Sequence, residues 1–270
     1  MEAERSGESS ALDRAWEALD EGDAQAALEL AESLDAGLRE AWILRASAHL
    51  EGGELSEARR ALERAAALPG PEDDLDLLWV RGEERLRSWR IDEARAQFEL
   101  AAEQERSAAV LGRLALCADL EGEPETSDRL LREAERLDPE NWPFPPRLAQ
   151  REFEDVLDSA IAELPEPFQR ALVDTQILVE PVPSQASVPP EWAEETPPDL
   201  LGLFVGPSML ERSYEASLEL PPTILLFQRN LERAARDADE LVEEIRITLY
   251  HEIGHMLGFD EEGVEGMGLE

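Results

Sequence analysis

Hydrophobic and polar positions follow different patterns in the two halves of the chain. The first half mixes Ala, Leu, Glu and Arg with few β-branched residues, and short breaks marked by Gly interrupt it, which predicts a series of helices. The proline-rich segment 138–146 cannot continue a helix, and short apolar runs with strand character follow it, so the second half is predicted to be α+β. Its expected elements are a helix over 152–163, strands over 176–180, 201–205 and 223–227, a loop over 181–198, and a helix over 234–257 that ends at Gly258.

The helical half has an internal repeat. Breaks at Gly22, Gly53, Trp89 and Gly122 are separated by 31, 36 and 33 residues, close to the ~34 of a helix-turn-helix repeat. Small residues follow each break at a distance of five, and bulky and small residues recur in step around the later breaks. The small residues are Ala27, Ala58, Ala94 and Ser127; the other recurring positions are Ala46, Gly82 and Ala115; Trp42, Leu78 and Leu111; Leu62, Phe98 and Leu131; and Ala65, Ala101 and Ala134.

This pattern resembles the tetratricopeptide repeat (TPR) over roughly residues 10–139. The resemblance implies an all-α solenoid of helical hairpins whose groove binds a peptide or a protein partner. An irregular helical bundle with an alanine-rich core is the alternative. The predicted organisation is a disordered N-terminus over 1–9, the TPR-like domain over 10–140, a proline-rich linker over 141–150 and a second domain over 151–270.

Charge and cysteine content narrow the possible partners. The formal net charge of -38 would repel nucleic acid and anionic membranes, so neither is expected as a partner, whereas basic partners are favoured. The hydrophobic content of 43% is too high for a disordered chain. Cys117 is the only cysteine, and the sequence contains neither a signal peptide nor an apolar run long enough to span a membrane. We therefore expect a cytoplasmic protein.

Candidate chemistry is concentrated near the end of the chain, in the sequence His251-Glu252-Ile253-Gly254-His255. Residues four apart lie on one face of a helix, so both imidazoles could bind one zinc ion (Zn2+), and Glu252 would act as general base on a water molecule at the metal. On a helical wheel both histidines lie away from the apolar stripe, on a side shared with Glu244 and Thr248. The stripe consists of Leu241, Val242, Ile245, Leu249, Ile253 and Met256. Two ordinary surface histidines are the alternative interpretation.

The choice of residues for the third zinc ligand can be narrowed by elimination. The only other histidine, His49, lies in the helical half, and only fifteen residues follow His255, so a carboxylate close behind the helix is expected. A turn at Gly258 would reverse the chain and bring Glu261 to the position of the third ligand in the longer H-E-x-x-H-x-x-G-x-x-H motif. Glu261 is the first choice, followed by Asp260 and then Glu262.

Residues 153–268 resemble the minimal zincin-like metallopeptidases of bacteria, which are small α+β proteins with a C-terminal HExxHxxGxxD-type motif. The stretches that carry the resemblance are 153–157, Leu164-Pro165, 201–204, 222–227 and, most closely, 246–260. The resemblance implies a zinc site formed by His251, His255 and an acidic residue at position 261, with Glu252 as general base and acid. This chain has Glu261 where the family more often has Asp.

Two function hypotheses follow. The first is a zinc-dependent metallopeptidase that hydrolyses peptide or protein substrates, with a weak preference for basic ones, and recruits them through its repeats. The second is a TPR-based interaction scaffold whose zincin domain binds zinc without turnover; an adaptor without zinc is a third possibility. Tyr214 or Tyr250 could stabilise an oxyanion, and the run 223–227 is either the edge strand that pairs with an extended peptide or a plain core strand.

Overall fold

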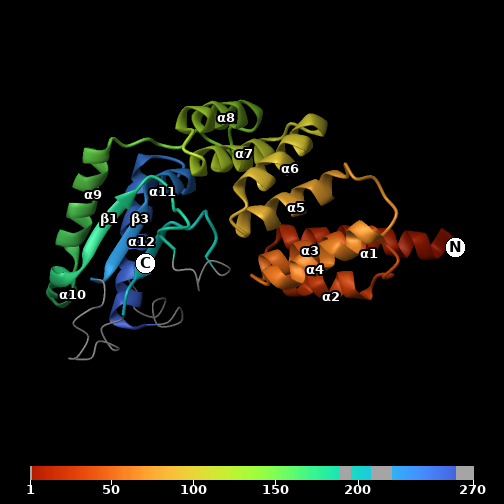
Figure 1. Cartoon of the computed structure of the whole chain (residues 1–270), viewed down its shortest axis with the longest axis horizontal. Helices are drawn as coiled ribbons and strands as arrows, with labels where there is room; N and C mark the ends of the chain where they lie inside the picture. The colour runs from red at the N-terminus through yellow and green to blue at the C-terminus, as the bar shows by residue number, and fades with distance from the viewer. Residues whose placement is uncertain (1, 189–195, 208–220, 260–270) are drawn as a thin grey trace. The chain divides into compact units, whose positions relative to one another are not determined.

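The computed structural model describes residues 2–188, 196–207 and 221–259. Its contacts divide the chain into two compact units (Figure 1). One unit comprises Met1–Leu137 with Glu191–Pro197, and the other comprises Asp138–Pro190 with Pro198–Glu270. The N-terminal region is helical and the C-terminal region has a small sheet with helices, as the sequence predicts. Among the described helices, none is long and apolar enough to cross a membrane.

The first unit is a succession of helices joined by short breaks. Residues at the breaks have left-handed backbone conformations, with φ of 79° at Gly22, 74° at Gly53, 58° at Trp89 and 78° at Gly122. Glycine adopts this region without steric cost, whereas a residue with a side chain, such as Trp89, adopts it only at a steric cost. The third break therefore carries backbone strain that the other three lack. The helices are α1 (Glu2–Asp20), α2 (Ala24–Ser33), α3 (Arg39–Glu51), α4 (Leu55–Ala67), α5 (Leu75–Arg87), α6 (Ile91–Gln104), α7 (Ala108–Leu120) and α8 (Pro124–Leu137). Helix α1 begins within the segment 1–9, for which the sequence predicts disorder.

Small residues at the repeating positions allow consecutive helices to approach closely. Ala27, Ala58, Ala94 and Ser127, each five residues after a break, are all buried. At Gly82 in α5, an added Cβ would lie only 2.5 Å from the ring of Phe98 in α6. Position 82 therefore has no room for a side chain while Phe98 keeps its place. The periodic small residues are therefore explained by packing within helix pairs. A tetratricopeptide architecture in the strict sense stays a prediction.

A buried carboxylate links several helices of this unit. The fully buried side chain of Glu84 in α5 accepts hydrogen bonds from Arg59 Nε of α4 at 3.0 Å, from Arg90 Nη2 at 2.8 and 2.9 Å, and from Ser88 Oγ at 3.0 Å. Arg85 is a further partner of the same carboxylate. Burial alone raises the pKa of Glu84, but the hydrogen bond from Arg59 and the neighbouring guanidinium groups outweigh this effect and lower the pKa below its ordinary value.

The substitution Glu84→Gln is expected to lower the free energy of unfolding at pH 7 by about 1–3 kcal/mol, because a buried charged acceptor is lost. Because the folded-state pKa is lowered, the stabilisation by Glu84 is present above the unfolded pKa of about 4.3 and is lost as the pH falls through the folded value. Urea unfolding at pH 7 and at about pH 3.5 tests this expectation. If wild type and Glu84→Gln differ in free energy of unfolding by the same amount at both pH values, the expectation is contradicted. Glu57→Gln, which alters a surface ion pair with Arg60, is the control.

The second unit is built on a mixed sheet in which the described strands have the order β1-β3-β2. Strand β1 (Gln176–Glu180) runs parallel to β3 (Thr223–Phe227), and β2 (Gly202–Val205) runs antiparallel to it. The strand prediction for 223–227 is confirmed, but the interpretation of this run as the edge strand is wrong. Strand β3 is central, and its continuous run of buried residues is typical of a strand covered on both faces. Among the described strands, β2 lies at the edge next to it.

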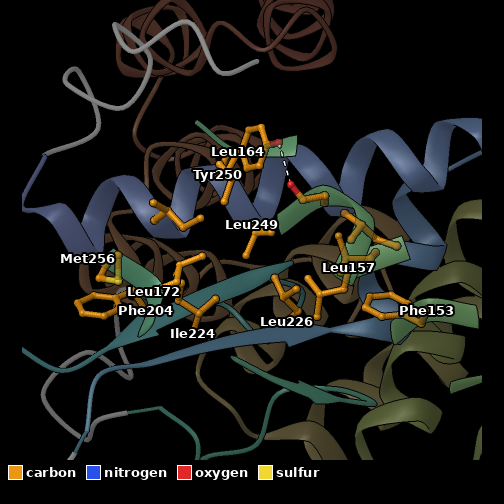
Figure 2. Close-up of a cluster of buried hydrophobic side chains, with 14 of the residues drawn as sticks. Phe153, Leu157, Leu164, Leu172, Phe204, Ile224, Leu226, Leu249, Tyr250 and Met256 are labelled. Carbon is orange, nitrogen blue, oxygen red and sulfur yellow. Dashed lines mark hydrogen bonds between the residues drawn. The ribbon is translucent and has the colours of Figure 1, made fainter. Parts of the chain in front are cut away.

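Helices cover the sheet and complete the core of this unit. They are α9 (Gln150–Glu163), α10 (Glu166–Ala171), the 3-10 turn η1 (Leu172–Asp174), α11 (Gln228–Ala234) and α12 (Ala238–Leu257). The predicted helix over 234–257 corresponds to α12, which begins four residues later because Asp237 caps its start. Helix α11, which ends at Ala234, precedes it and was not predicted. Figure 2 shows the side chains that α9, α12, β2 and β3 contribute to a shared core, among them Phe153, Phe204, Leu226 and Leu249.

The linker into this unit is fixed to α11 by a second buried carboxylate. Glu232, which is 1% exposed, accepts hydrogen bonds from Arg147 Nη1 at 2.8 Å and from the backbone N–H of Leu148 at 3.2 Å. Gln228 Nε2 donates both to Glu232 at 2.8 Å and to the carbonyl oxygen of Leu148 at 2.8 Å. The chain that leads into α9 is therefore part of the folded unit from Arg147 onward.

Candidate active site

Helix α12 carries the candidate residues, and its two ends have well-defined caps. At the N-terminus, the Asp237 carboxylate accepts hydrogen bonds from the backbone N–H groups of Asp239 and Glu240. At the C-terminus, Gly258 has a left-handed φ of 99°, and its N–H bonds to the carbonyl groups of Gly254 and His255. The predicted helix end at Gly258 is confirmed, because glycine adopts this conformation without a steric penalty.

Most of the predicted apolar stripe of α12 faces the core. Leu241, Ile245, Leu249, Ile253 and Met256 have no exposed surface. The exception is Val242, whose side chain is 44% exposed although it was expected to pack with the others. It lines a pocket between α12 and α9, together with Val156 and Arg246. His251 and His255 are half-buried, as expected for residues outside the stripe.

The two imidazoles converge through the same ring atom. Nε2 of His251 lies 3.0 Å from Nε2 of His255, and the rings, with centroids 4.6 Å apart, are nearly perpendicular at 82°. Two nitrogens bound to one tetrahedral zinc at the usual bond length would lie about 3.3 Å apart. The donor pair therefore fits a zinc ion with little side-chain movement.

A backbone carbonyl orients the second histidine. Nδ1 of His255 lies 3.2 Å from the carbonyl oxygen of Phe259, just beyond the Gly258 turn. With the proton on Nδ1 and donated to Phe259, the lone pair of Nε2 points toward His251 and is available to a metal. The turn at Gly258 thus both ends the helix and returns a hydrogen-bond acceptor to the ligand residue.

Glu252 is the most buried of the three candidate site residues, with 6% of its surface exposed. Its side chain lies against Gly202 at the start of β2, beside Thr248 of the preceding helical turn. Glu244 lies two turns before His251 on the same face, and burial, followed by the charges of Glu240 and Glu243, raises its pKa.

The acidic third ligand lies outside the described residues. Asp260, Glu261 and Glu262 follow Phe259, the last described residue. In the described ranges, no group of three or more His, Cys, Asp or Glu residues is arranged to hold a metal ion. The structure thus brings His251, Glu252 and His255 together, and Glu261 stays a prediction.

Tyr214 and Tyr250 were the two tyrosines expected from the sequence as possible oxyanion donors. Tyr250 is buried, and its hydroxyl donates to the carbonyl oxygen of Ala160 in α9 at 3.2 Å (Figure 2), so it is a packing residue. Tyr214 lies outside the described residues. Sequence reasoning did not identify Gly202, against which Glu252 lies; the glycine at the start of an apolar strand was the available signal, since such glycines mark close approaches.

Residues 172–269 match the family model of zincin-like metallopeptidases. The match covers 98 of the 270 residues and includes β1, β2, β3, α11, α12 and the whole HExxH segment. This supports a zincin-like metallopeptidase domain at these positions, and proteins of this family generally bind zinc. The comparison with curated proteins gave no match.

The substitution Tyr250→Phe is expected to lower the free energy of unfolding by about 1 kcal/mol, because it removes one buried hydrogen bond to Ala160. Zinc binding and any peptide hydrolysis are expected to stay at the wild-type level. Thermal unfolding and a hydrolysis assay on the same preparation measure the two effects. A large loss of hydrolysis at unchanged stability would instead place this hydroxyl at the reacting carbonyl.

Proposed function

We propose that the chain is a zinc-dependent peptidase whose catalytic centre is formed by His251, Glu252 and His255. The observation that carries the proposal is the convergence of the two Nε2 atoms at 3.0 Å, with the Glu252 carboxylate buried beside an edge strand. The match to zincin-like metallopeptidases over the same segment supports it. Peptides or proteins are the proposed substrates.

His251 and His255 would hold the zinc, with Glu261 as the proposed third ligand and Asp260 or Glu262 as alternatives. When bound, zinc supplies Lewis acidity, which polarises a peptide carbonyl and lets water lose a proton near neutral pH. Nδ1 of His255, held by the Phe259 carbonyl, keeps Nε2 in the form that binds metal. These assignments use imidazole and carboxylate groups, which are typical zinc ligands.

Glu252 is the proposed proton carrier. It is one residue after His251 and three before His255, so its carboxylate lies beside the ligand pair without sharing their direction. One carboxylate oxygen would accept a proton from the attacking water, and the same group would then give that proton to the leaving amine nitrogen. The low exposure of Glu252 keeps bulk water from competing for this proton.

Strand β2 is the proposed docking edge for an extended substrate. The N–H of Phe227 donates to the carbonyl of Leu201 at 2.9 Å, so Leu201 and, two residues on, Leu203 form the hydrogen-bonded pairs with β3. The backbone groups of Gly202 and Phe204 consequently point away from β3 toward the other edge of β2. A peptide that adds to this edge would pair with Gly202, the residue in contact with Glu252.

For the helical unit, we propose tetratricopeptide-like repeats that recruit the substrate or a partner protein. The positive φ at all four predicted breaks and the buried small residues five positions later support repeated helical hairpins. Groups of such hairpins offer extended surfaces for peptide segments. The strongly acidic composition favours basic partners.

A scaffold without turnover is the second candidate. Tyr250, one of the two tyrosines that could stabilise an oxyanion, is hydrogen-bonded to Ala160 in the core instead. A domain that binds zinc but lacks an oxyanion donor would act through its helical unit alone. Measuring turnover and zinc content on the same protein separates the two functions.

Purified wild-type protein is expected to contain about one zinc ion per chain, and His255→Ala is expected to lose it because an imidazole ligand is removed. Elemental analysis measures both. His49→Ala is the matched control, because His49 bonds to Glu54 in the helical unit and should not affect the zinc content. Among Asp260→Ala, Glu261→Ala and Glu262→Ala, only Glu261→Ala is expected to lose zinc. A wild-type protein that takes up no zinc on reconstitution would exclude the proposal.

The substitution Glu252→Gln is expected to reduce hydrolysis of fluorescently labelled casein by about 10²- to 10⁴-fold while zinc stays bound, because an amide cannot accept the proton. Glu243→Gln, on the same helix but paired with Arg246, is the control that should retain activity. Equal hydrolysis by wild type and Glu252→Gln would rule out Glu252 as the base. Zinc-loaded wild type that cleaves nothing would favour the scaffold.

A further inference from the structure

Strand β2 lies close to helix α12 at Gly202, beside the candidate site. A Cβ added to Gly202 would lie 2.7 Å from Cγ2 of Thr248 and 3.1 Å from both Cγ and Oε1 of Glu252. The first distance is shorter than van der Waals contact allows, and the other two are tight. A side chain at position 202 therefore has no room unless the helix residues move.

Neither neighbour can move away easily. Thr248 is 7% exposed and β-branched, so its χ1 angle is restricted and its methyl group has little space to rotate into. Glu252 lies one helical turn further on the same face and is equally buried. Rigid separation of the strand from the helix is also opposed, because Phe204 and Leu249 belong to the same packed core.

The backbone of Gly202 has a second role in the proposed reaction. In the antiparallel register with β3, Gly202 lies opposite Leu226 in a pair without mutual hydrogen bonds. Its N–H and C=O groups are thus those that an extended substrate would pair with at the edge of β2. The residue that would hold the substrate backbone is the same residue against which the general base lies.

We infer that Gly202 is a positioning residue that sets the distance between the Glu252 carboxylate and the substrate backbone. The inference rests on the proposed peptidase function and identifies a determinant of it outside the HExxH motif. The missing side chain lets the carboxylate lie directly against the strand that receives the substrate. With any side chain at position 202, Glu252 is displaced from that strand, while the histidine pair, which is not among the three nearest neighbours of an added Cβ, keeps its geometry.

The first test is Gly202→Ala, assayed on labelled casein with zinc bound. We expect kcat to fall by about 10- to 100-fold, the effect of a displacement of about 1 Å in a catalytic group, whereas KM and zinc affinity stay unchanged. In the double variant Gly202→Ala/Thr248→Ser, the methyl group nearest to the added Cβ is absent, so part of the lost kcat should return. Thr248→Ser alone is the reference for this rescue.

Gly52→Ala is the matched control. An added Cβ at Gly52, in the helical unit, has its nearest neighbour at 3.5 Å, an ordinary contact, so this variant should keep wild-type kcat. Unchanged kcat in Gly202→Ala would overturn the inference. A loss that Thr248→Ser does not restore, or a loss of zinc together with activity, would overturn it as well.

A second measurement needs no turnover. If the added Cβ collides with Glu252, Gly202→Ala should lower the melting temperature less in the Glu252→Ala background than in the wild type. Equal shifts in both backgrounds would refute the contact. If zinc-loaded wild type fails to cleave casein, the proposed peptidase function fails by itself, and this thermal cycle still decides whether Gly202 fixes the position of Glu252.

Discussion

The packing of one face of α12 against the sheet is the interaction on which the rest of the site depends. Leu241, Ile245, Leu249, Ile253 and Met256 are completely buried, and each such side chain contributes roughly 1.5–3 kcal/mol through removal from water. A rotation of the helix by one residue would turn this face by about 100° and expose it. The same packing therefore fixes the direction of Glu252 toward Gly202 of β2 and the side of the helix from which His251 and His255 project. Apolar contacts of α12 thus orient the residues of the candidate site.

Local features of the second unit could be predicted from the sequence, because each depends on residues close together in the chain. The strands over 176–180 and 223–227 match their predicted bounds, and Gly258 ends α12 where the left-handed turn was expected. The order of the strands could not be predicted in the same way. Whether β2 or β3 lies at the edge depends on pairings between distant segments, and a four-residue strand such as β2 carries little pattern of its own.

In the candidate site, too, the features that depend on nearby residues could be predicted, and those that depend on distant residues could not. Two histidines four apart on a helix already imply converging imidazoles, and the structure places their Nε2 atoms together. The contact between Glu252 and Gly202 joins residues fifty positions apart, and the hydrogen bond of Tyr250 to Ala160 joins residues ninety apart, so neither is visible in any local pattern. Glu84 is a similar case in the helical unit, where one glutamate among many acidic residues proves to be the acceptor for several arginines.

The core of the second unit extends beyond the segment that matches the family model. Phe153, Leu157 and Ala160 of α9 pack into the same core as α12, and the chain is already fixed at Arg147 by Glu232, whereas the family match begins at residue 172. A fragment cut at residue 172 would retain the whole HExxH segment, yet it would uncover the apolar surface beneath α9 and leave the Glu232 carboxylate without Arg147. Such a fragment would tend to aggregate, and an inactive preparation of it would reveal nothing about the catalytic residues. The folding unit and the segment matched by the family model therefore begin at different residues of this chain.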